Sequence, residues 1–165
     1  MLKEMRVAGI TVDPFTNTPI VILKDLEDRE VLPIWIGLLE ASSIATALEH
    51  LPTPRPMTHD LMRNILDSLG VKIMKIEIND LRDNTYYALI HLDVQGKRLV
   101  IDSRPSDAIA LALRVEAPIY VDEEVLQKSA KVEAEKKGDK VVTDSKEWED
   151  ILESLSPDDF GKYKM

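Results

Sequence analysis

The segment that most constrains the fold is AIALAL at residues 108–113, six consecutive apolar residues that closely follow Pro105. The residue before a proline is kept out of the helical region, and proline itself is favoured at the first helical position. The sequence therefore predicts a helix that begins at Pro105. Because this helix has no polar side along residues 108–113, it must be buried on more than one face. Any fold for this chain has to place it between other layers.

Alternation of apolar and polar residues predicts two groups of three strands, each an antiparallel meander with short turns. The first group is expected at residues 5–12, 19–24 and 30–36, and the second at 71–78, 84–94 and 97–102. Pro33 indicates that the third strand is an edge or carries a bulge, because proline cannot donate to a sheet ladder. A slip of the alternation at Met74 and Lys75 indicates a β-bulge.

Helical spacing of apolar residues predicts two helices between the meanders, separated by the rigid three-proline stretch LPTPRPM at 51–57. The first follows Gly37. The second is expected from the N-cap Thr58 to the closing Gly70. Its buried stripe is expected to comprise Leu61, Met62, Ile65, Leu66 and Leu69. A short strand at 118–121 and a helix opening with DEEVLQK follow the central helix.

These elements define an α+β protein. We expect a mixed, largely antiparallel sheet of two meanders, packed with three main helices and followed by a C-terminal helical tail. The main domain is expected to cover residues 1–130. Residues 131–165 are expected to form a charged linker and a short amphipathic helix over KEWEDILESL at 146–155.

The amino-acid composition excludes cysteine chemistry and opposes non-specific binding to nucleic acids. The chain has no cysteine, which removes disulfides and thiolate metal sites. Its apolar runs are too short for a membrane span, and its first residues lack a signal-peptide block, so we expect a cytoplasmic protein without a membrane partner. A net charge of −9 opposes non-specific nucleic-acid binding unless a local basic patch or bound cations compensate.

Polar side chains gather at the expected starts of helices and the end of one strand, and they are the candidate site. They are Glu40, His59, Asp60, Asp102, Arg104, Ser106 and Asp107. Without a cysteine, a GxSxG elbow or a glycine-rich loop, the available set is carboxylates, an arginine and a histidine. That set suits Mg²⁺ or Mn²⁺ acting on a phosphate-bearing substrate, with His59 as general acid or base.

A purely architectural interpretation explains part of the same pattern. Acids in a first helical turn stabilise a helix by about 0.3–1 kcal/mol through its dipole. Arg104 is different, because a cation beside a helix N-terminus opposes the dipole, and such local conflicts are enriched at functional sites. Arg104 could also be a structural partner of Asp102 or Asp107.

Several motifs together resemble the bifunctional nuclease family. They are LPIWIGLLEASSIATAL at 32–48, RPMTHDLMRNIL at 55–66, DNTYYALIHL at 83–92, IDSRPSDAIALAL at 101–113 and PIYVDEEVL at 118–126. Asn84 stands where a glycine is expected in the DGT-type turn, and asparagine tolerates the left-handed conformation. The resemblance implies an α+β domain that self-associates and an activity on RNA and DNA.

The resemblance adds Arg55 to the candidate residues. On this hypothesis Glu40, His59, Asp60 and Asp107 are catalytic, and Arg55, Arg104 and Ser106 hold substrate phosphate. The expected metal ligands are Asp60, Asp102 and Asp107.

Two functions remain open at this point. One is a metal-assisted nuclease that hydrolyses phosphodiester bonds in RNA or DNA. The other is a non-catalytic, homo-oligomeric interaction or ligand-binding module whose polar cluster is structural. Under both, apolar surface around Trp35 and the strands at 20–36 predicts a homodimer or dimer-based assembly.

Overall fold

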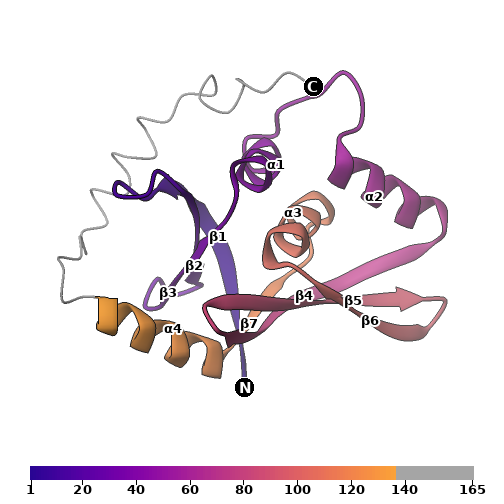
Figure 1. Ribbon diagram of the computed structural model, residues 1–165. Helices are drawn as coiled ribbons and strands as arrows, with labels where there is room; N and C mark the ends of the chain where they lie inside the picture. The colour runs from indigo at the N-terminus through magenta and orange to yellow at the C-terminus, as the bar shows by residue number, and fades with distance from the viewer. Residues whose placement is uncertain (137–165) are drawn as a thin grey trace.

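The computed structural model describes residues 1–136, which form an α+β fold of seven strands and four helices (Figure 1). In chain order the elements are β1 (Leu2–Val12), β2 (Pro19–Asp25), β3 (Val31–Trp35), α1 (Leu38–Leu48), α2 (Thr58–Ser68), β4 (Val71–Arg82), β5 (Thr85–Val94), β6 (Lys97–Ser103), α3 (Pro105–Val115), β7 (Ile119–Asp122) and α4 (Glu123–Lys136). The expected fold class is confirmed.

All seven strands belong to one sheet with the order β3-β2-β1-β7-β4-β5-β6. The two predicted meanders, β1 to β3 and β4 to β6, are both present, and β7 joins them. It pairs antiparallel with β1 and parallel with β4, which is the one parallel pairing among the described strands. Strands β3 and β6 are the two edges, so the edge position inferred from Pro33 is confirmed.

Local sequence explains how the second meander turns. Asp83 and Asn84 both have positive φ, 49° and 62°, as a two-residue type I′ hairpin requires. Asparagine therefore replaces glycine in this turn without changing its conformation. The register of β4 against β5 shifts between Ile73 and Lys75, which is the bulge that the slipped alternation predicts.

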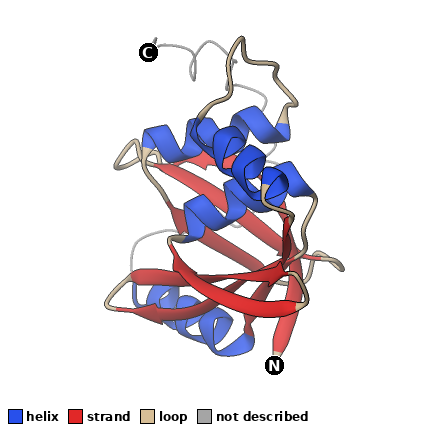
Figure 2. Cartoon of the chain, turned by 90° about the vertical axis from the view of Figure 1, so that its right-hand side faces the viewer, coloured by secondary structure: helices blue, strands red, loops and turns tan. Residues whose placement is uncertain are grey.

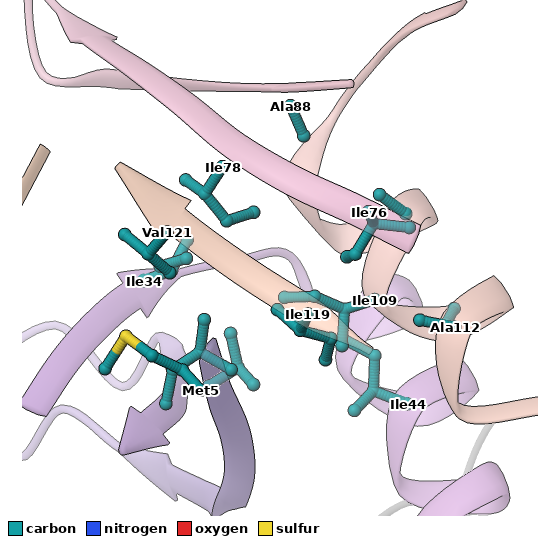
Figure 3. Close-up of a cluster of buried hydrophobic side chains, with 14 of the residues drawn as sticks. Met5, Ile34, Ile44, Ile76, Ile78, Ala88, Ile109, Ala112, Ile119 and Val121 are labelled. Carbon is teal, nitrogen blue, oxygen red and sulfur yellow. The ribbon is translucent and has the colours of Figure 1, made fainter. Parts of the chain in front are cut away.

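Helix α3 is the central helix, as its apolar sequence requires. Residues Ala108–Ala112 are all buried, and α3 begins at Pro105 with Arg104 as its extended N-cap residue. Ile109 of α3 lies in one buried cluster with Ile44 of α1 and Ile76 of β4 (Figure 3). Helices α1, α2 and α3 gather on one side of the molecule, and α4 lies on the other (Figures 1 and 2).

The burial predicted for α2 is wrong. Leu61, Met62, Ile65 and Leu69 are exposed, and the row that faces the protein is His59, Arg63 and Leu66. The spacing is helical as predicted, but the docking face is rotated, because polar side chains at the start of α2 bond to α3. The N-cap residue is Met57 rather than Thr58, and its N–H donates to the Asp60 carboxylate over 3.0 Å.

The expected boundary at residue 130 is crossed by α4, which continues to Lys136. The division of the chain into a main domain and a charged linker stays a prediction. The predicted helix at 146–155 lies outside the described residues. Within residues 1–136, the helices are too short or too polar to cross a lipid bilayer.

Candidate functional site

Helices α1, α2 and α3 lie together (Figure 1), and side chains from the first turns of α1 and α2 contact the N-terminus of α3 at the candidate site. Both α1 and α2 contact α3 directly. The order of the sheet brings this about, since α3 follows the edge strand β6 and returns across the core to β7. Polar residues that are 64 positions apart in sequence, Glu40 and Arg104, become neighbours as a result.

His59 is the centre of the site and is held from both sides of its ring. Its Nε2 lies 2.9 Å from Asp107 Oδ1, and its Nδ1 lies 2.6 Å from the Ser43 hydroxyl. An ionised carboxylate can only accept a hydrogen bond, so Nε2 carries the proton and Nδ1 accepts from Ser43. The result is a chain of hydrogen bonds from serine through histidine to aspartate, built on α1, α2 and α3 in turn.

Arg104 extends this chain towards solvent. Its Nε donates to Asp107 Oδ2 over 2.9 Å, and its Nη1 donates to Glu40 Oε1 over 3.0 Å. The Arg104 side chain is 64% exposed, whereas the His59 side chain is 11% exposed. The cation is thus accessible and the histidine is shielded. Gly37 helps to place Glu40, because a Cβ at position 37 would collide with the Glu40 carboxylate.

The charges of the cluster stabilise one another. Partial burial raises the pKa of Asp107, but hydrogen bonds from Arg104 and His59 outweigh it and hold that pKa below its usual range. Hydrogen bonds to Asp107 and Glu40 raise the pKa of Arg104. Asp107 is therefore ionised at neutral pH, as the protonation of His59 at Nε2 requires.

Asp60 belongs to a second, separate ion pair. Its Oδ1 accepts from Arg114 Nε over 2.8 Å, and the Arg114 side chain is only 4% exposed. Burial raises the pKa of Asp60, but the hydrogen bonds from Arg114 and from the Met57 N–H lower it below the ordinary value. Arg114 also donates to the carbonyl of Ser43 over 3.1 Å. Thus α2 is fixed to α3 at two points, through His59 to Asp107 and through Asp60 to Arg114.

Within residues 1–136, the remaining candidates, Asp102, Ser106 and Arg55, make no side-chain hydrogen bond to His59. Asp102 is exposed and pairs with Leu89, one position beyond Ile101 and Ile90. Because Ile90 belongs to the core, alternation puts Asp102 on the opposite face of the sheet from α3. Ser106 is buried.

Arg55 stands on the exposed proline-rich loop and lines a cavity of about 470 Å³ between α1, this loop and α2. Within residues 1–136, the guanidinium groups of Arg55 and of its neighbour in the cavity, Arg63, have no hydrogen-bond or ion-pair partner at contact distance. The charge of Arg63 acts on Asp60, which lines the same cavity together with Glu116.

The carboxylates expected to hold a metal ion do not fit that role. Asp60, Asp107 and Asp102 lie in three different places, and both oxygens of Asp60 and of Asp107 accept hydrogen bonds from protein groups. Among the described residues, no three His, Cys, Asp or Glu side chains are grouped so that they could hold a metal ion. In this arrangement the three carboxylates do not form a common site for Mg²⁺ or Mn²⁺.

Two residues of the site were missed by sequence reasoning, Ser43 and Arg114. Ser43 lies three positions after Glu40, on the same side of α1, and this spacing was the available signal. Arg114 lies seven positions, about two helical turns, after Asp107, and so occupies the same side of α3. Small and apolar residues around both positions made them look like packing.

The fold and site together define an α+β domain with a histidine-centred polar cluster at three helix starts. The bifunctional nuclease domain family matches residues 21–134 of this chain. An uncharacterized protein of Mycobacterium tuberculosis is 38% identical over 164 residues, which cover 96% of this chain and 98% of the relative. The chain belongs to the bifunctional nuclease domain family.

Plant relatives carry the name of the family. Bifunctional nuclease 1 of Oryza sativa subsp. indica is 28% identical over 110 residues, covering 64% of this chain and 33% of the rice protein. Bifunctional nuclease 2 of Arabidopsis thaliana is 28% identical over 107 residues, covering 62% of this chain and 32% of the relative. The match to these plant proteins is thus about a third of their length.

Proposed function

We propose that this protein is a nuclease that hydrolyses phosphodiester bonds, with His59 as its general base. The observation that carries the proposal is the hydrogen-bonded chain Ser43–His59–Asp107 beside an exposed arginine. Family membership supports the class of substrate, RNA or DNA.

The base is oriented as proton transfer requires. Asp107 keeps the proton on Nε2 and leaves the lone pair of Nδ1 directed at the Ser43 hydroxyl, 2.6 Å away. When that hydroxyl, or a water in its place, attacks phosphorus, its proton passes to Nδ1. The imidazolium is stabilised by Asp107 and then returns the proton to the departing oxygen of the strand. With water as the nucleophile this completes hydrolysis. With Ser43 as the nucleophile a phosphoserine diester remains, and a water molecule hydrolyses it in a second step in which His59 takes the proton of the water and returns it to the Ser43 oxygen.

Arginines supply the positive charge that the acidic chain lacks overall. Arg104 is exposed beside Asp107 and can turn part of its guanidinium group to a phosphate oxygen. The guanidinium groups of Arg55 and Arg63 have no partner at contact distance within the described residues and line the same cavity, which suits a neighbouring phosphate of the strand. These three arginines are already counted in the net charge of −9, so their contribution is positive charge at this place on an acidic chain.

The decisive experiment is cleavage of end-labelled single-stranded RNA and DNA by the full chain, with Mg²⁺, with Mn²⁺ and with EDTA. We expect His59→Gln and Asp107→Asn to lower the rate by about 10²–10⁴-fold, the usual contribution of general acid–base catalysis. Ser43→Ala separates a serine nucleophile, whose loss stops cleavage, from a water nucleophile, which the smaller side chain admits. The EDTA arm tests the metal requirement that the sequence suggested.

A matched control is present in the same molecule. His91 Nε2 lies 2.9 Å from Glu77 Oε2, the same distance as between His59 and Asp107, but it lies on β5 and outside the cluster. His91→Gln should leave cleavage unchanged. Equal losses for His59→Gln and His91→Gln would contradict a specific role for His59.

The second candidate is a non-catalytic module, and one observation favours it: both oxygens of Asp107 and both ring nitrogens of His59 already have protein partners. On this alternative the cluster only fastens α1 and α2 to α3. Absence of cleavage under every metal condition, with binding of oligonucleotide retained, would establish the module and exclude the nuclease.

A further inference from the structure

The two edges of the sheet differ in how far they are closed to further strands. β3 has five residues and contains Pro33, which has no N–H to offer a neighbour. The carbonyl of Pro33 is also engaged, because the Tyr86 hydroxyl donates to it over 3.3 Å. The neighbouring strand β2 is almost wholly buried, so of the apolar surface expected at residues 20–36 mainly Leu26, Val31 and Trp35 remain exposed.

β6 is open at the other edge. It has seven residues without a proline, and residues 97–102 are all exposed. Three apolar side chains stand in its middle, with Leu99 51%, Val100 50% and Ile101 43% exposed. A long apolar edge strand presents unpaired backbone groups and is a template for another strand.

Leu99 and Ile101 lie on the face of the sheet that packs against the core, but at the edge where that face is exposed. They lie opposite Leu92 and Ile90 of β5, which are both buried. Val100 points to the other face, between Arg98 and Asp102. Within residues 1–136, neither Arg98 nor Asp102 makes an ion pair with another side chain. The edge thus exposes apolar side chains on both faces and two opposite charges, of which Asp102 acts on Arg82 without an ion pair at contact distance.

We infer that β6 pairs antiparallel with β6 of a second copy of this chain, with Val100 opposite Val100 on a two-fold axis. A two-fold axis perpendicular to the sheet leaves every side chain on the same face of the sheet in both copies. Residues that pair across the axis must therefore both have even numbers or both have odd numbers. Of the registers that meet this condition, only the one centred on Val100 pairs all seven residues, because Val100 is the middle of 97–103.

This register also pairs the charges. It sets Arg98 opposite Asp102 of the second copy, twice by symmetry, and sets Leu99 opposite Ile101. A shift centred on Leu99 would place Arg98 opposite Val100. A shift centred on Ile101 would place Val100 opposite Asp102. The sequence of β6 is therefore self-complementary in one register, and the occupant of the edge is another copy of the same strand.

Charge reversal tests the register. We expect the full chain to be a dimer by sedimentation at micromolar concentration. Arg98→Glu and Asp102→Arg should each weaken dimerisation by roughly ten- to a hundredfold, since each creates two like-charge cross-strand pairs. The double variant Arg98→Glu with Asp102→Arg restores both pairs and should restore the dimer. Lys131→Glu, an equal charge change on exposed α4, is the control and should have no effect.

Cross-linking tests the axis directly. The natural chain has no cysteine, so a single introduced cysteine can react only with its symmetry mate. Directly opposite Cα atoms in an antiparallel pair are about 4.5–5.5 Å apart, within disulfide range, whereas diagonal positions are farther apart. Val100→Cys should form a disulfide-linked dimer under mild oxidation, and Leu99→Cys should do so much less.

A monomeric parent chain, or a dimer that is unaffected by Arg98→Glu, would overturn the inference. Unfolding of the single variants is detected by circular dichroism, and rescue in the double variant excludes it as the cause. The inference does not depend on nuclease activity, because every readout is a mass or a cross-link.

Discussion

Arg104 and Arg114 stand at opposite ends of α3 and make similar bonds in contrasting surroundings. Each guanidinium group donates to a carboxylate, with Nε to carboxylate oxygen distances of 2.9 and 2.8 Å. Arg104 is 64% exposed, and Arg114 is 4% exposed. The geometry of an ion pair therefore does not reveal its role. Burial decides whether the pair stabilises the fold or is available to a ligand.

The helix itself adds to the difference. A cation at the C-terminal end of a helix is stabilised by the dipole, and one at the N-terminus is destabilised. Arg114 is in the last turn and also donates to two backbone carbonyls, those of Ala110 and Ser43. Arg104 is at the N-cap position with carboxylate partners alone. Arg104 therefore has more to gain from an added anion.

The largest expected effect is on the buried pair. Arg114→Ala should lower the free energy of unfolding by about 3–5 kcal/mol, because Asp60 keeps a partly buried charge without its partner. Chemical denaturation measures this value, with Arg29→Ala, an exposed arginine, as the control. A loss below about 1 kcal/mol would mean that the two pairs do not differ in the way proposed.

A smaller effect is expected at the residue that touches both networks. Ser43→Ala removes the hydroxyl bond to His59 but keeps the carbonyl bond to Arg114. Its cost should be about 0.5–1.5 kcal/mol, the usual net value of one hydrogen bond. Thermal unfolding followed by circular dichroism checks it. A cost as large as that of Arg114→Ala would show that the two networks act as one unit.

Arg104→Ala should change stability less than Arg114→Ala or Ser43→Ala, while lowering activity. An exposed ion pair contributes about 0–1 kcal/mol, so the melting temperature should barely move. Cleavage and the affinity for oligonucleotide should both fall, because the accessible cation is lost. A large drop in melting temperature with unchanged cleavage would reverse the assignment of the two arginines.

The smallest expected difference between the two ion pairs is in how protein stability depends on acidic pH. Asp60 and Asp107 both have folded pKa values below the ordinary value of about 3.9. Their contribution to stability is therefore complete above about pH 4 and is lost as the pH falls through the folded pKa values. Arg114→Ala should weaken the part of the pH dependence of unfolding free energy that comes from Asp60. Arg104→Ala should weaken the part that comes from Asp107. Parallel denaturation curves between pH 5 and pH 2 would show this, and unchanged pH dependence in both variants would contradict it.

Local patterns predicted much of this fold. The two meanders, the bulge after Ile73 and the start of α3 at Pro105 all follow from periodicity or from backbone chemistry. The exposed stripe of α2 could not be anticipated, because its orientation is set by His59 and Asp60 reaching α3. Burial of an apolar stripe is a tendency, and two polar anchors overrode it.

The candidate site was predicted only in part, because local sequence signals identify some of its residues and tertiary contacts determine the others. Acids and an arginine at helix starts gave Glu40, Arg104 and Asp107, since the helix dipole makes such positions recognisable. Ser43 lies inside α1, where a polar residue has no local explanation, and the helix dipole already accounts for Arg114 in the last turn of α3, so neither position pointed to a site. Their roles depend on which helices become neighbours, and that depends on the position of β7 in the sheet.

The placement of β7 has a consequence for biosynthesis. β1 and β4 have no hydrogen bonds to each other, so the sheet stays in two pieces until residues 119–122 have been made. Each meander can form from short-range hairpins as it is synthesised, but their union needs contacts between the first and the last strand. Until then, β1 and β4, the two longest strands, each leave an edge unpaired. The nascent chain therefore passes through a stage at which two long edges are open to association, and insertion of four residues ends it.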